Sequence, residues 1–427
     1  MPYRRLRPIF KIHIHQRQTC GSMPKGFYLL VFAQFASGLA DNALMILGIH
    51  FLHEQGYPGW WSPLLKFFFT LSYVVLAGFV GPIADAFPKG RLMASMNILK
   101  LSGVLLLLCG LHPFLGFALA GMAAAVYAPA KYALVTESVR PSLLVKANAW
   151  LEVSVVLSVL LGVALGGWLT GWHHDDFVSG VLVKASDPWW VKTQMWPAFA
   201  AVCLIYLVST LLNLGLKSMD VHNRRTSLTW RAVWWAAFWK NNRRLWSDPL
   251  GGFSLYVTSL CWGVGAVLQF AVLVWAQSAA GLSLEQGAYL QALVAVGVIS
   301  GAVLSARAYQ IFNARGALPW AVVLAVLLPC MAMTTSVWVA VPLLILAGCA
   351  GGMLLVPMNA LLQHRGQRIL TSGRSVAVQG FNENLSVLVM LGFYSILLAW
   401  QVPFWLVMLL LMVPLLASAK PWLLKWA

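Results

Sequence analysis

The chain consists of long, nearly continuous apolar stretches separated by short polar segments. Most stretches reach about 20 residues, the length an α-helix needs to cross the hydrocarbon core of a bilayer. They lack the ten-residue alternation of barrel strands, and a bilayer admits only helices or closed barrels. We therefore predict an all-α membrane protein with twelve spans, at residues 27–50, 64–83, 93–112, 115–138, 144–170, 195–216, 250–280, 286–306, 317–335, 338–362, 375–399 and 402–419.

Composition agrees with this reading. Hydrophobic residues make up 60% of the 427 residues and charged residues only 10%, against about 45–50% apolar usage in soluble domains. The net charge of +17 could suggest a nucleic-acid partner. However, apart from Lys100 and Lys131 within spans, nearly all Lys and Arg fall on one side of the predicted topology, and only Lys66 near the start of the second span, Lys184 and Lys192 fall on the other. This asymmetry places both termini in the cytoplasm and explains the charge without nucleic acid.

Five segments follow from this topology. Residues 1–26 are a basic cytoplasmic tail, 27–216 a six-helix bundle, 217–249 a basic Trp-rich connection, 250–419 a second six-helix bundle, and 420–427 a cytoplasmic tail. The first 22 residues are read as a disordered tail, as an extension upstream of a start at Met23, or as a cleaved signal peptide. The connection is read as an amphipathic helix on the cytoplasmic leaflet, with a plain linker as the alternative.

Several ionisable residues lie inside otherwise apolar spans: Asp41, Lys100, Lys131, Glu152 and Glu383. A charge at the middle of a span costs about 2.5–3.5 kcal/mol on insertion scales, so such residues usually mark a polar path within the bundle. Asp41, with Asn42 beside it, lines a cavity or is capped by a neighbouring helix. Lys131 either snorkels to the interface or faces inward, toward Glu152 or an anionic substrate group. Lys100 has the same alternatives, with snorkelling favoured.

The two halves of the chain resemble each other weakly. Pro129 and Pro357 both lie late in the fourth span of their half. In the next span, Asn148 and Glu152 parallel Gln379 and Glu383, and each pair is one helical turn apart, so amide and carboxylate share a face. Six spans per half give a parallel repeat, the arrangement of major facilitator transporters, with the substrate between the halves.

A loop between the second and third spans supports the same fold. The segment GPIADAFPKGR, from Gly81 to Arg91, resembles the major facilitator signature GxxxD(R/K)xGR(R/K). Gly81 would allow two helices to approach closely, and Asp85 with Arg91 would latch their cytoplasmic ends. The segment departs from the signature because Ala86 replaces a basic residue and because Lys89, Gly90 and Arg91 come late.

Signatures of enzymes are missing from the sequence. It contains no P-loop, GxSxG or HExxH motif. The run His173-His174-Asp175-Asp176 reads as a solvated turn, and the six cysteines have no paired or metal-binding spacing. We expect a protein that is not an enzyme and has no metal site, disulfide framework or cofactor.

Six motifs in order carry a closer resemblance: AQFASGLADNAL, GPIADAFPKGRLM, YAPAKYALVTE, LVKANAWLE, LLVPMNALLQHRG and SVAVQGFNENLSVLVMLGFYS. Together they resemble the bacterial lysophospholipid transporters of the major facilitator superfamily, over about residues 27–419. The resemblance implies a monomeric flippase of the inner membrane. It would bring lysophosphatidylethanolamine and related lysolipids to the cytoplasmic leaflet, where an acyltransferase–acyl-carrier-protein synthetase reacylates them. Members of the family carry a basic residue where this chain has Gln269, so phosphate recognition would depend more on Lys131.

A zwitterionic headgroup needs charges of both signs along its route. We predict that Lys131 approaches the phosphate and that Glu383 or Asp41 approaches the ammonium. The predicted translocation residues are Asp41, Asn42, Lys100, Lys131, Asn148, Glu152, Gln269, Asn359, Gln379, Glu383 and Asn384. A proton-coupled exporter of drugs or small amphipathic solutes, with Glu383 as proton carrier, is the alternative. A scaffold or lipid sensor, which would give no flux, is the third possibility.

Overall fold

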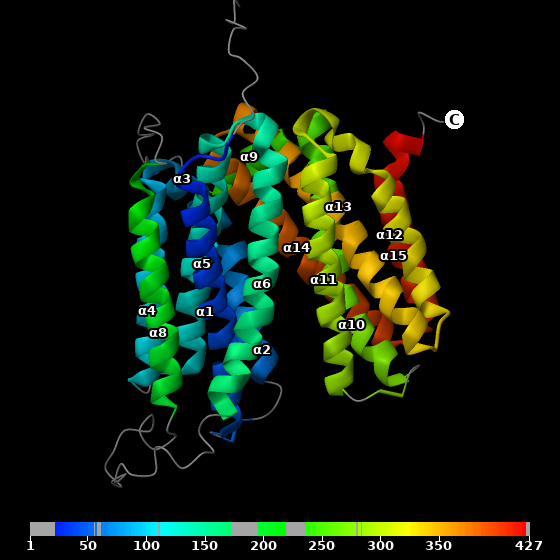
Figure 1. Ribbon diagram of the computed structural model, residues 1–427, viewed down its shortest axis with the longest axis horizontal. Helices are drawn as coiled ribbons and strands as arrows, with labels where there is room; N and C mark the ends of the chain where they lie inside the picture. The colour runs from blue at the N-terminus through cyan, green and yellow to red at the C-terminus, as the bar shows by residue number, and fades with distance from the viewer. Residues whose placement is uncertain are drawn as a thin grey trace, which may run out of the picture.

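The computed structural model describes residues 22–54, 56–57, 61–109, 112–171, 195–218, 235–278, 281–282 and 284–423, and all regular elements within these ranges are helices. They form two bundles side by side (Figure 1). The first bundle contains α1 (Phe27–Glu54), α2 (Trp61–Val75), α3 (Ala77–Ala86), α4 (Lys89–Leu108), α5 (Pro113–Ser138), α6 (Leu144–Gly171) and α8 (Trp196–Leu214). The second contains α10 (Pro249–Ser278), α11 (Leu284–Ala308), α12 (Pro319–Ala332), α13 (Val337–Ile369), α14 (Ser372–Ala399) and α15 (Phe404–Leu423).

Short elements connect these helices. A separate helix, α9 (Trp235–Ser247), lies in the chain between the two bundles. Three 3-10 turns, η1 (Pro141–Leu143), η3 (Gly215–Ser218) and η5 (Ile311–Ala317), lie at helix ends. Ten of the described helices are long and apolar enough to span a bilayer, and a bent pair would make eleven. Phe404–Ala419 is a shorter apolar helix at the place of the twelfth predicted span, so the count of twelve stays a prediction.

The second predicted span, 64–83, is not one straight helix. It is divided into α2 and α3, which are bent by 68° relative to each other. The break is at Leu76, whose carbonyl oxygen accepts hydrogen bonds from the backbone N–H groups of both Phe79 and Val80. A new helix therefore starts at this point, and apolar content alone does not reveal it.

The two bundles share one hydrophobic core at one end only. We call this the basic end, because Lys89, Arg140 and Arg368 lie there; the positive-inside rule predicts it to be cytoplasmic. Here one cluster joins Leu30, Leu134 and Leu144 of the first bundle to Ala302 and Leu354 of the second. Among the described residues elsewhere, the large clusters belong to one bundle at a time. The bundles are thus closed together at the basic end.

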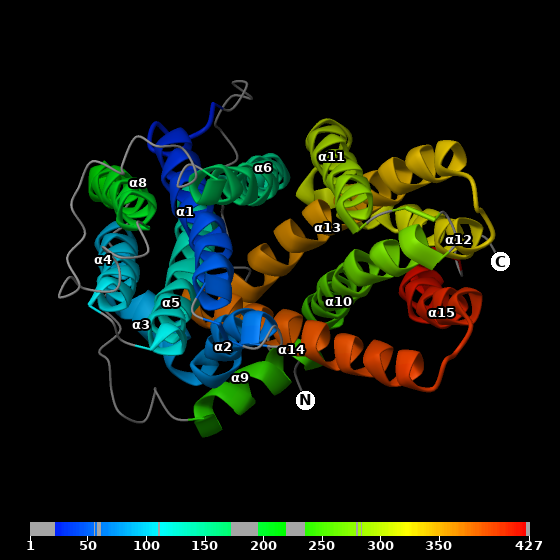
Figure 2. The same ribbon diagram turned by 90° about the horizontal axis from the view of Figure 1, so that it is seen from below.

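Helices α13 and α14 extend from the second bundle toward the first when the molecule is seen along the bundles (Figure 2). Helix α14 approaches α3 of the first bundle closely. A Cβ atom added to Gly81 would lie 2.8 Å from the Cα atom of Arg374. Only a glycine permits this backbone distance, which confirms the close helix approach expected at Gly81.

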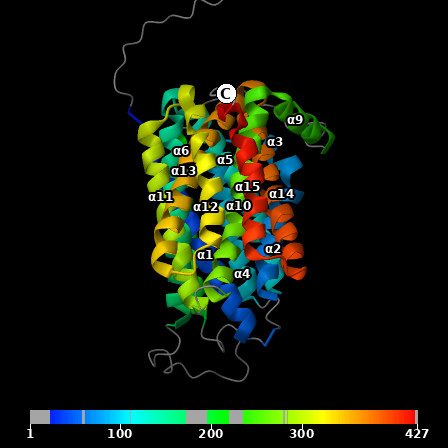
Figure 3. The same cartoon turned by 90° about the vertical axis from the view of Figure 1, so that its right-hand side faces the viewer.

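Helix α9 packs on the outside of both bundles at the basic end (Figure 3). Trp235 lies over Gly78 of α3, while Phe238 and Trp239 make edge-to-face contacts with Phe381 of α14. An amphipathic helix was predicted over the whole of 217–249. The structure has a helix over 235–247, while residues 219–234 lie outside the described part, so the rest of the predicted helix stays a prediction.

Candidate functional site

Asp41 and Lys100 form an ion pair inside the first bundle. The Lys100 Nζ atom lies 2.6 Å from Asp41 Oδ2, and the Lys100 side chain is 1% exposed. The Tyr206 hydroxyl donates to Asp41 Oδ1 at 2.7 Å. Lys100 therefore does not snorkel to the interface, and that prediction is wrong. Asp41 is held by the neighbouring helices α4 and α8, which is the capped environment considered from the sequence.

Hydroxyl and amide groups extend this ion pair into a network. Lys100 also donates to Ser37, whose hydroxyl donates to Asn97 at 2.9 Å. Asn97 donates to Ser209 at 2.7 Å, and Ser209 donates to the backbone carbonyl of Ala33. We call Ser37, Asp41, Asn97, Lys100, Tyr206 and Ser209 the enclosed network. It joins α1, α4 and α8 and satisfies its charges within one bundle.

Lys131 has a different environment, at the boundary between the bundles. Its side chain is buried, and its ammonium donates to Gln34 Oε1 at 2.9 Å and lies 4.4 Å from the centre of the Tyr132 ring. Glu152 of α6 lies within electrostatic reach, but the two groups form no ion pair. The inward position of Lys131 is therefore found, and its predicted pairing with Glu152 is not.

Two carboxylates lie near Lys131 and Tyr132, Glu152 on α6 of the same bundle and Glu383 on α14 of the other bundle. Glu152 is 6% exposed and, within the described ranges, has no hydrogen-bond or ion-pair partner. Glu383 of α14 accepts a hydrogen bond from Gln379 at 2.8 Å, and Gln379 also donates to Asn359 of α13. Tyr132 lies within electrostatic reach of both carboxylates. We call Lys131, Glu152 and Glu383 the boundary charges.

The two halves use their matching amides differently. Gln379 bonds to Glu383 one turn away, as the shared face suggests. Asn148 does not contact Glu152 but exchanges two hydrogen bonds of 2.9 Å with Gln363 of α13 in the other bundle. Asn148 and Gln363 are both buried, so this amide pair closes the boundary at the basic end.

A second closure joins α3 to α14. Asp85 accepts hydrogen bonds from the Thr371 hydroxyl and, at 2.8 Å, from the backbone N–H of Gly373, and its carboxylate lies 3.9 Å from Arg374. The predicted latch between Asp85 and Arg91 is wrong, because Asp85 reaches the other bundle and Arg91 is exposed. Two other positions of this loop act within the first bundle.

Lys89 and Gly90, in the segment from Gly81 to Arg91, make contacts within the first bundle. Lys89 lies 2.8 Å from Glu137 at the end of α5, and both side chains are almost fully buried. Gly90 packs against the backbone of Asn213 at the end of α8, where a Cβ atom would lie 3.0 Å from its carbonyl oxygen. These contacts fix the start of α4 within the first bundle.

Three predicted residues form no hydrogen bond with the boundary charges within the described ranges. Asn42 and Asn384 each donate to the backbone carbonyl one turn earlier in their own helix, Gly38 and Gly380. Gln269 is exposed on α10, and its backbone carbonyl accepts a hydrogen bond from Gln291.

Sequence reasoning also missed residues that matter, namely Gln34, Gln363, Thr371 and Tyr206. Gln34 and Tyr206 appear in the sequence only as single polar side chains in apolar spans, while Gln363 and Thr371 lie between two predicted spans.

The described residues contain no group of three or more His, Cys, Asp or Glu side chains placed to hold a metal ion. The run His173–Asp176 lies outside the described residues. The site itself consists of charges of both signs at the boundary between the two bundles.

Comparisons with known proteins agree with this geometry. The Major Facilitator Superfamily profile matches residues 30–385. Proteins named lysophospholipid transporter LplT, from Yersinia pestis (strain Pestoides F) and Yersinia pseudotuberculosis serotype O:3 (strain YPIII), are 35% identical over 383 residues, covering 89% of this chain and 89% of each relative.

Solved structures share the fold at low sequence identity. A crystal structure of the major facilitator transporter FucP in the outward conformation gives a TM-score of 0.71 at 14% identity, covering 93% of this chain and 98% of that one. The human organic anion transporter MFSD10 gives a TM-score of 0.70 at 14% identity, covering 93% and 99%. The chain is thus a multi-pass membrane transporter rather than an enzyme, and it belongs to the lysophospholipid transporter family of the major facilitator superfamily.

Proposed function

We propose that this protein moves lysophospholipids, above all lysophosphatidylethanolamine, to the cytoplasmic leaflet of the bacterial inner membrane. The observation that carries the proposal is the set of boundary charges. Lys131 has no carboxylate partner within ion-pair distance, and neither Glu152 nor Glu383 has a cationic one among the described residues. Buried charges of both signs without partners suit a ligand that brings both signs itself.

The headgroup of lysophosphatidylethanolamine has this character, with a phosphate and an ammonium. In our proposal Lys131 binds the phosphate, and Glu383 or Glu152 binds the ammonium. Asp41 was the other candidate for the ammonium, but its carboxylate is engaged by Lys100 and Tyr206, which favours the boundary carboxylates. The single acyl tail would remain in lipid or against apolar helix faces while the headgroup crosses.

The closure at the basic end supports the direction of transport. With the two bundles joined there, our proposal is that a headgroup reaches the boundary charges from the opposite end. Opening of the basic end would then release it toward the cytoplasm, where an acyltransferase–acyl-carrier-protein synthetase would consume it. We propose that one monomer performs this cycle, because both bundles that flank the charges come from one chain.

Uptake by spheroplasts of a strain that lacks its own lysophospholipid transporter tests the proposal. Labelled lysophosphatidylethanolamine is offered to cells that produce the wild type, Lys131→Ala or Lys146→Ala. Lys146 is exposed on α6, so its variant controls for loss of a lysine. We expect uptake by Lys131→Ala to fall at least about tenfold, which corresponds to about 1.4 kcal/mol, and uptake by Lys146→Ala to match the wild type. Normal uptake by Lys131→Ala would contradict the proposed binding of the phosphate by Lys131.

The surroundings of Glu383 favour one other candidate, a proton-coupled exporter of small amphipathic solutes. Gln379 donates to this carboxylate, but among the described residues no cation pairs with it, and such an acid is suited to carry a proton. The same spheroplasts, with and without a dissipated proton gradient, separate the two functions. Uptake of labelled lysolipid supports the flippase, and proton-driven efflux of a dye without lysolipid uptake supports the exporter.

A further inference from the structure

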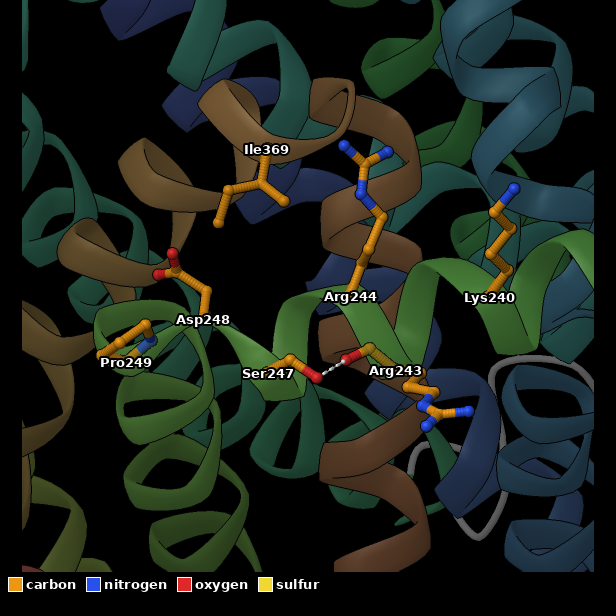
Figure 4. A pocket seen from close by; sticks show the side chains of 7 residues that line it. All are labelled: Lys240, Arg243, Arg244, Ser247, Asp248, Pro249 and Ile369. Carbon is orange, nitrogen blue, oxygen red and sulfur yellow. Dashed lines mark hydrogen bonds between the residues drawn. The ribbon is translucent and has the colours of Figure 1, made fainter.

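An open hollow of about 430 Å³ lies beside α9 at the basic end, away from the boundary charges. It is lined by Lys240, Arg243, Arg244, Ser247, Asp248, Pro249 and Ile369. Figure 4 shows Lys240 and Arg244, one helical turn apart, extending from the same side of α9. The volume is within the range of about 300–1,000 Å³ that small-ligand sites occupy. We call this hollow the α9 pocket.

The α9 pocket has three cations whose charge the protein leaves unpaired. Lys240, Arg243 and Arg244 are exposed and have no ion-pair partner among the described residues. The one carboxylate of the pocket, on Asp248, is already bound by Arg365 through hydrogen bonds of 2.8 and 2.9 Å. Asp248 also accepts a hydrogen bond from the backbone N–H of Gly251. The pocket therefore attracts an anion and offers no free carboxylate to an ammonium.

The position of α9 identifies the source of that anion. Phe238 and Leu245 bury one face of the helix against the bundles, while Trp239 and Trp246 remain 51% and 41% exposed. Exposed tryptophans beside span ends are typical of the headgroup layer of a membrane. Trp246 is also fixed there, because its indole N–H donates to Asn382 of α14 at 3.1 Å. The cations of the α9 pocket thus lie where lipid phosphates are abundant.

We propose that the α9 pocket binds the phosphate of an anionic phospholipid, of the phosphatidylglycerol class, from the leaflet at the basic end. Lys240 and Arg244 contact the phosphate, Arg243 adds to the local positive potential, and the exposed indoles lie against the upper acyl chains. An anionic lipid is favoured over phosphatidylethanolamine because the ammonium of the latter would face three cations. This site is separate from the transport route and does not depend on the proposed substrate.

Native mass spectrometry of the delipidated full-length protein tests the proposal. The protein is mixed with equimolar phosphatidylglycerol and phosphatidylethanolamine of identical acyl chains. The double variant Lys240→Gln/Arg244→Gln is compared with Arg307→Gln/Arg315→Gln, which removes two exposed charges of the same end outside the pocket. We expect the wild type and the control to retain phosphatidylglycerol preferentially, and the pocket variant to lose that preference by about tenfold or more.

Four results would overturn the proposal. One is equal retention of phosphatidylglycerol by the pocket variant and the wild type. Another is an equal loss in both double variants, which would mean that general positive charge rather than a site holds the lipid. The third is displacement of the bound lipid by millimolar glycerol 3-phosphate, which would show a site for soluble phosphate compounds. If an acidic soluble protein binds at α9 and wild-type protein shows no lipid preference, the surface is a protein-docking site.

Discussion

The enclosed network and the boundary charges both lie largely inside the protein and both carry charge, yet their surroundings differ. In the enclosed network, Asp41 and Lys100 are 2.6 Å apart and hydrogen bonds continue through Ser37 and Asn97. Among the boundary charges, Lys131 has an amide for a partner and Glu152 has no partner within the described residues. The first set is complete without a ligand, and the second is not.

This difference separates structural charges from functional ones more sharply than burial does. An ion pair inside one bundle keeps its partners while the bundle moves as a body. Groups at the boundary change their surroundings whenever the two bundles move relative to each other. Variants of the enclosed network should therefore affect folding, and variants of the boundary should affect transport and the balance between conformations.

The largest effect on stability is expected from Lys100→Met. It leaves the carboxylate of Asp41 buried without its cation, and breaking such a pair costs about 3–5 kcal/mol. Thermal unfolding of purified protein in detergent should show a much lower Tm for Lys100→Met than for Lys131→Met. In addition, Asp41→Leu/Lys100→Met should regain part of the loss, because no charge remains. Equal drops in Tm for the two lysine variants would contradict the distinction between the structural charges of the enclosed network and the functional boundary charges.

A smaller effect is expected when closure of the boundary is obstructed. In Gly81→Val the added Cβ would lie 2.8 Å from the Cα atom of Arg374, and overpacking of this kind costs about 1–3 kcal/mol. The closed basic end should then open, and maleimide should label a cysteine placed at buried Ala147 faster. Gly265→Val is the matched control, because a Cβ at Gly265 meets no atom within 4 Å. Unchanged labelling in Gly81→Val would argue against closure at this contact.

The amide pair should couple the bundles by a still smaller energy. Polar contacts between membrane helices average about 0.6 kcal/mol and reach about 1.7 kcal/mol in double-mutant cycles. We expect Asn148→Ala and Gln363→Ala to give a coupling energy in this range, measured on the same labelling equilibrium. A cycle of Asn42→Ala with Gln363→Ala should give none, because Asn42 bonds within its own helix. If the effects of Asn148→Ala and Gln363→Ala on the labelling equilibrium are strictly additive, the role of this amide pair in closure is contradicted.

The smallest effect should come from the ion pair of Asp248 with Arg365, outside the bilayer. The bound guanidinium of Arg365 lowers the pKa of Asp248. A lowered pKa means that the pair stabilises the protein above the unfolded-state pKa of about 3.9, and that this contribution is lost as the pH falls through the folded-state pKa. The pair should stabilise the wild type over Asp248→Asn by about 1 kcal/mol or less at pH 7, so the gap in Tm between them should be small and should shrink below pH 4. A Tm difference that widens at acid pH would contradict a lowered pKa of Asp248 in the folded protein.

Much of this architecture could be predicted from the sequence because apolar length and the asymmetry of Lys and Arg are local signals. The parallel between Gln379-Glu383 and Asn148-Glu152 also located the boundary between the halves. The break at Leu76 was not predictable, since the residues around it are as apolar as any span. Within the connection the structure has a helix at Trp235–Ser247, whose start a basic Trp-rich composition does not mark.

The hydrogen-bond and ion-pair partners of the polar side chains could not be predicted from the sequence. Asp85 was assigned to Arg91, six positions away, but it reaches Thr371 and Gly373, and nothing in the chain between them signals that contact. Lys100 was expected at the interface because a long side chain can reach it, yet Asp41 and Tyr206 on other helices hold it inside. Contacts between helices distant in sequence decide both cases.

The amide pair of Asn148 and Gln363 has one more consequence, for the energy source of the transport cycle. Side-chain amides are neutral and neither gain nor lose protons in the physiological range. Contacts of this type form and break without binding or releasing an ion. The equilibrium between the formed and the broken amide pair therefore does not depend on the electrochemical gradient of the membrane. Any driving ion would have to act through the carboxylates, at Asp85, Glu152 or Glu383, while the amide pair sets the resting conformation.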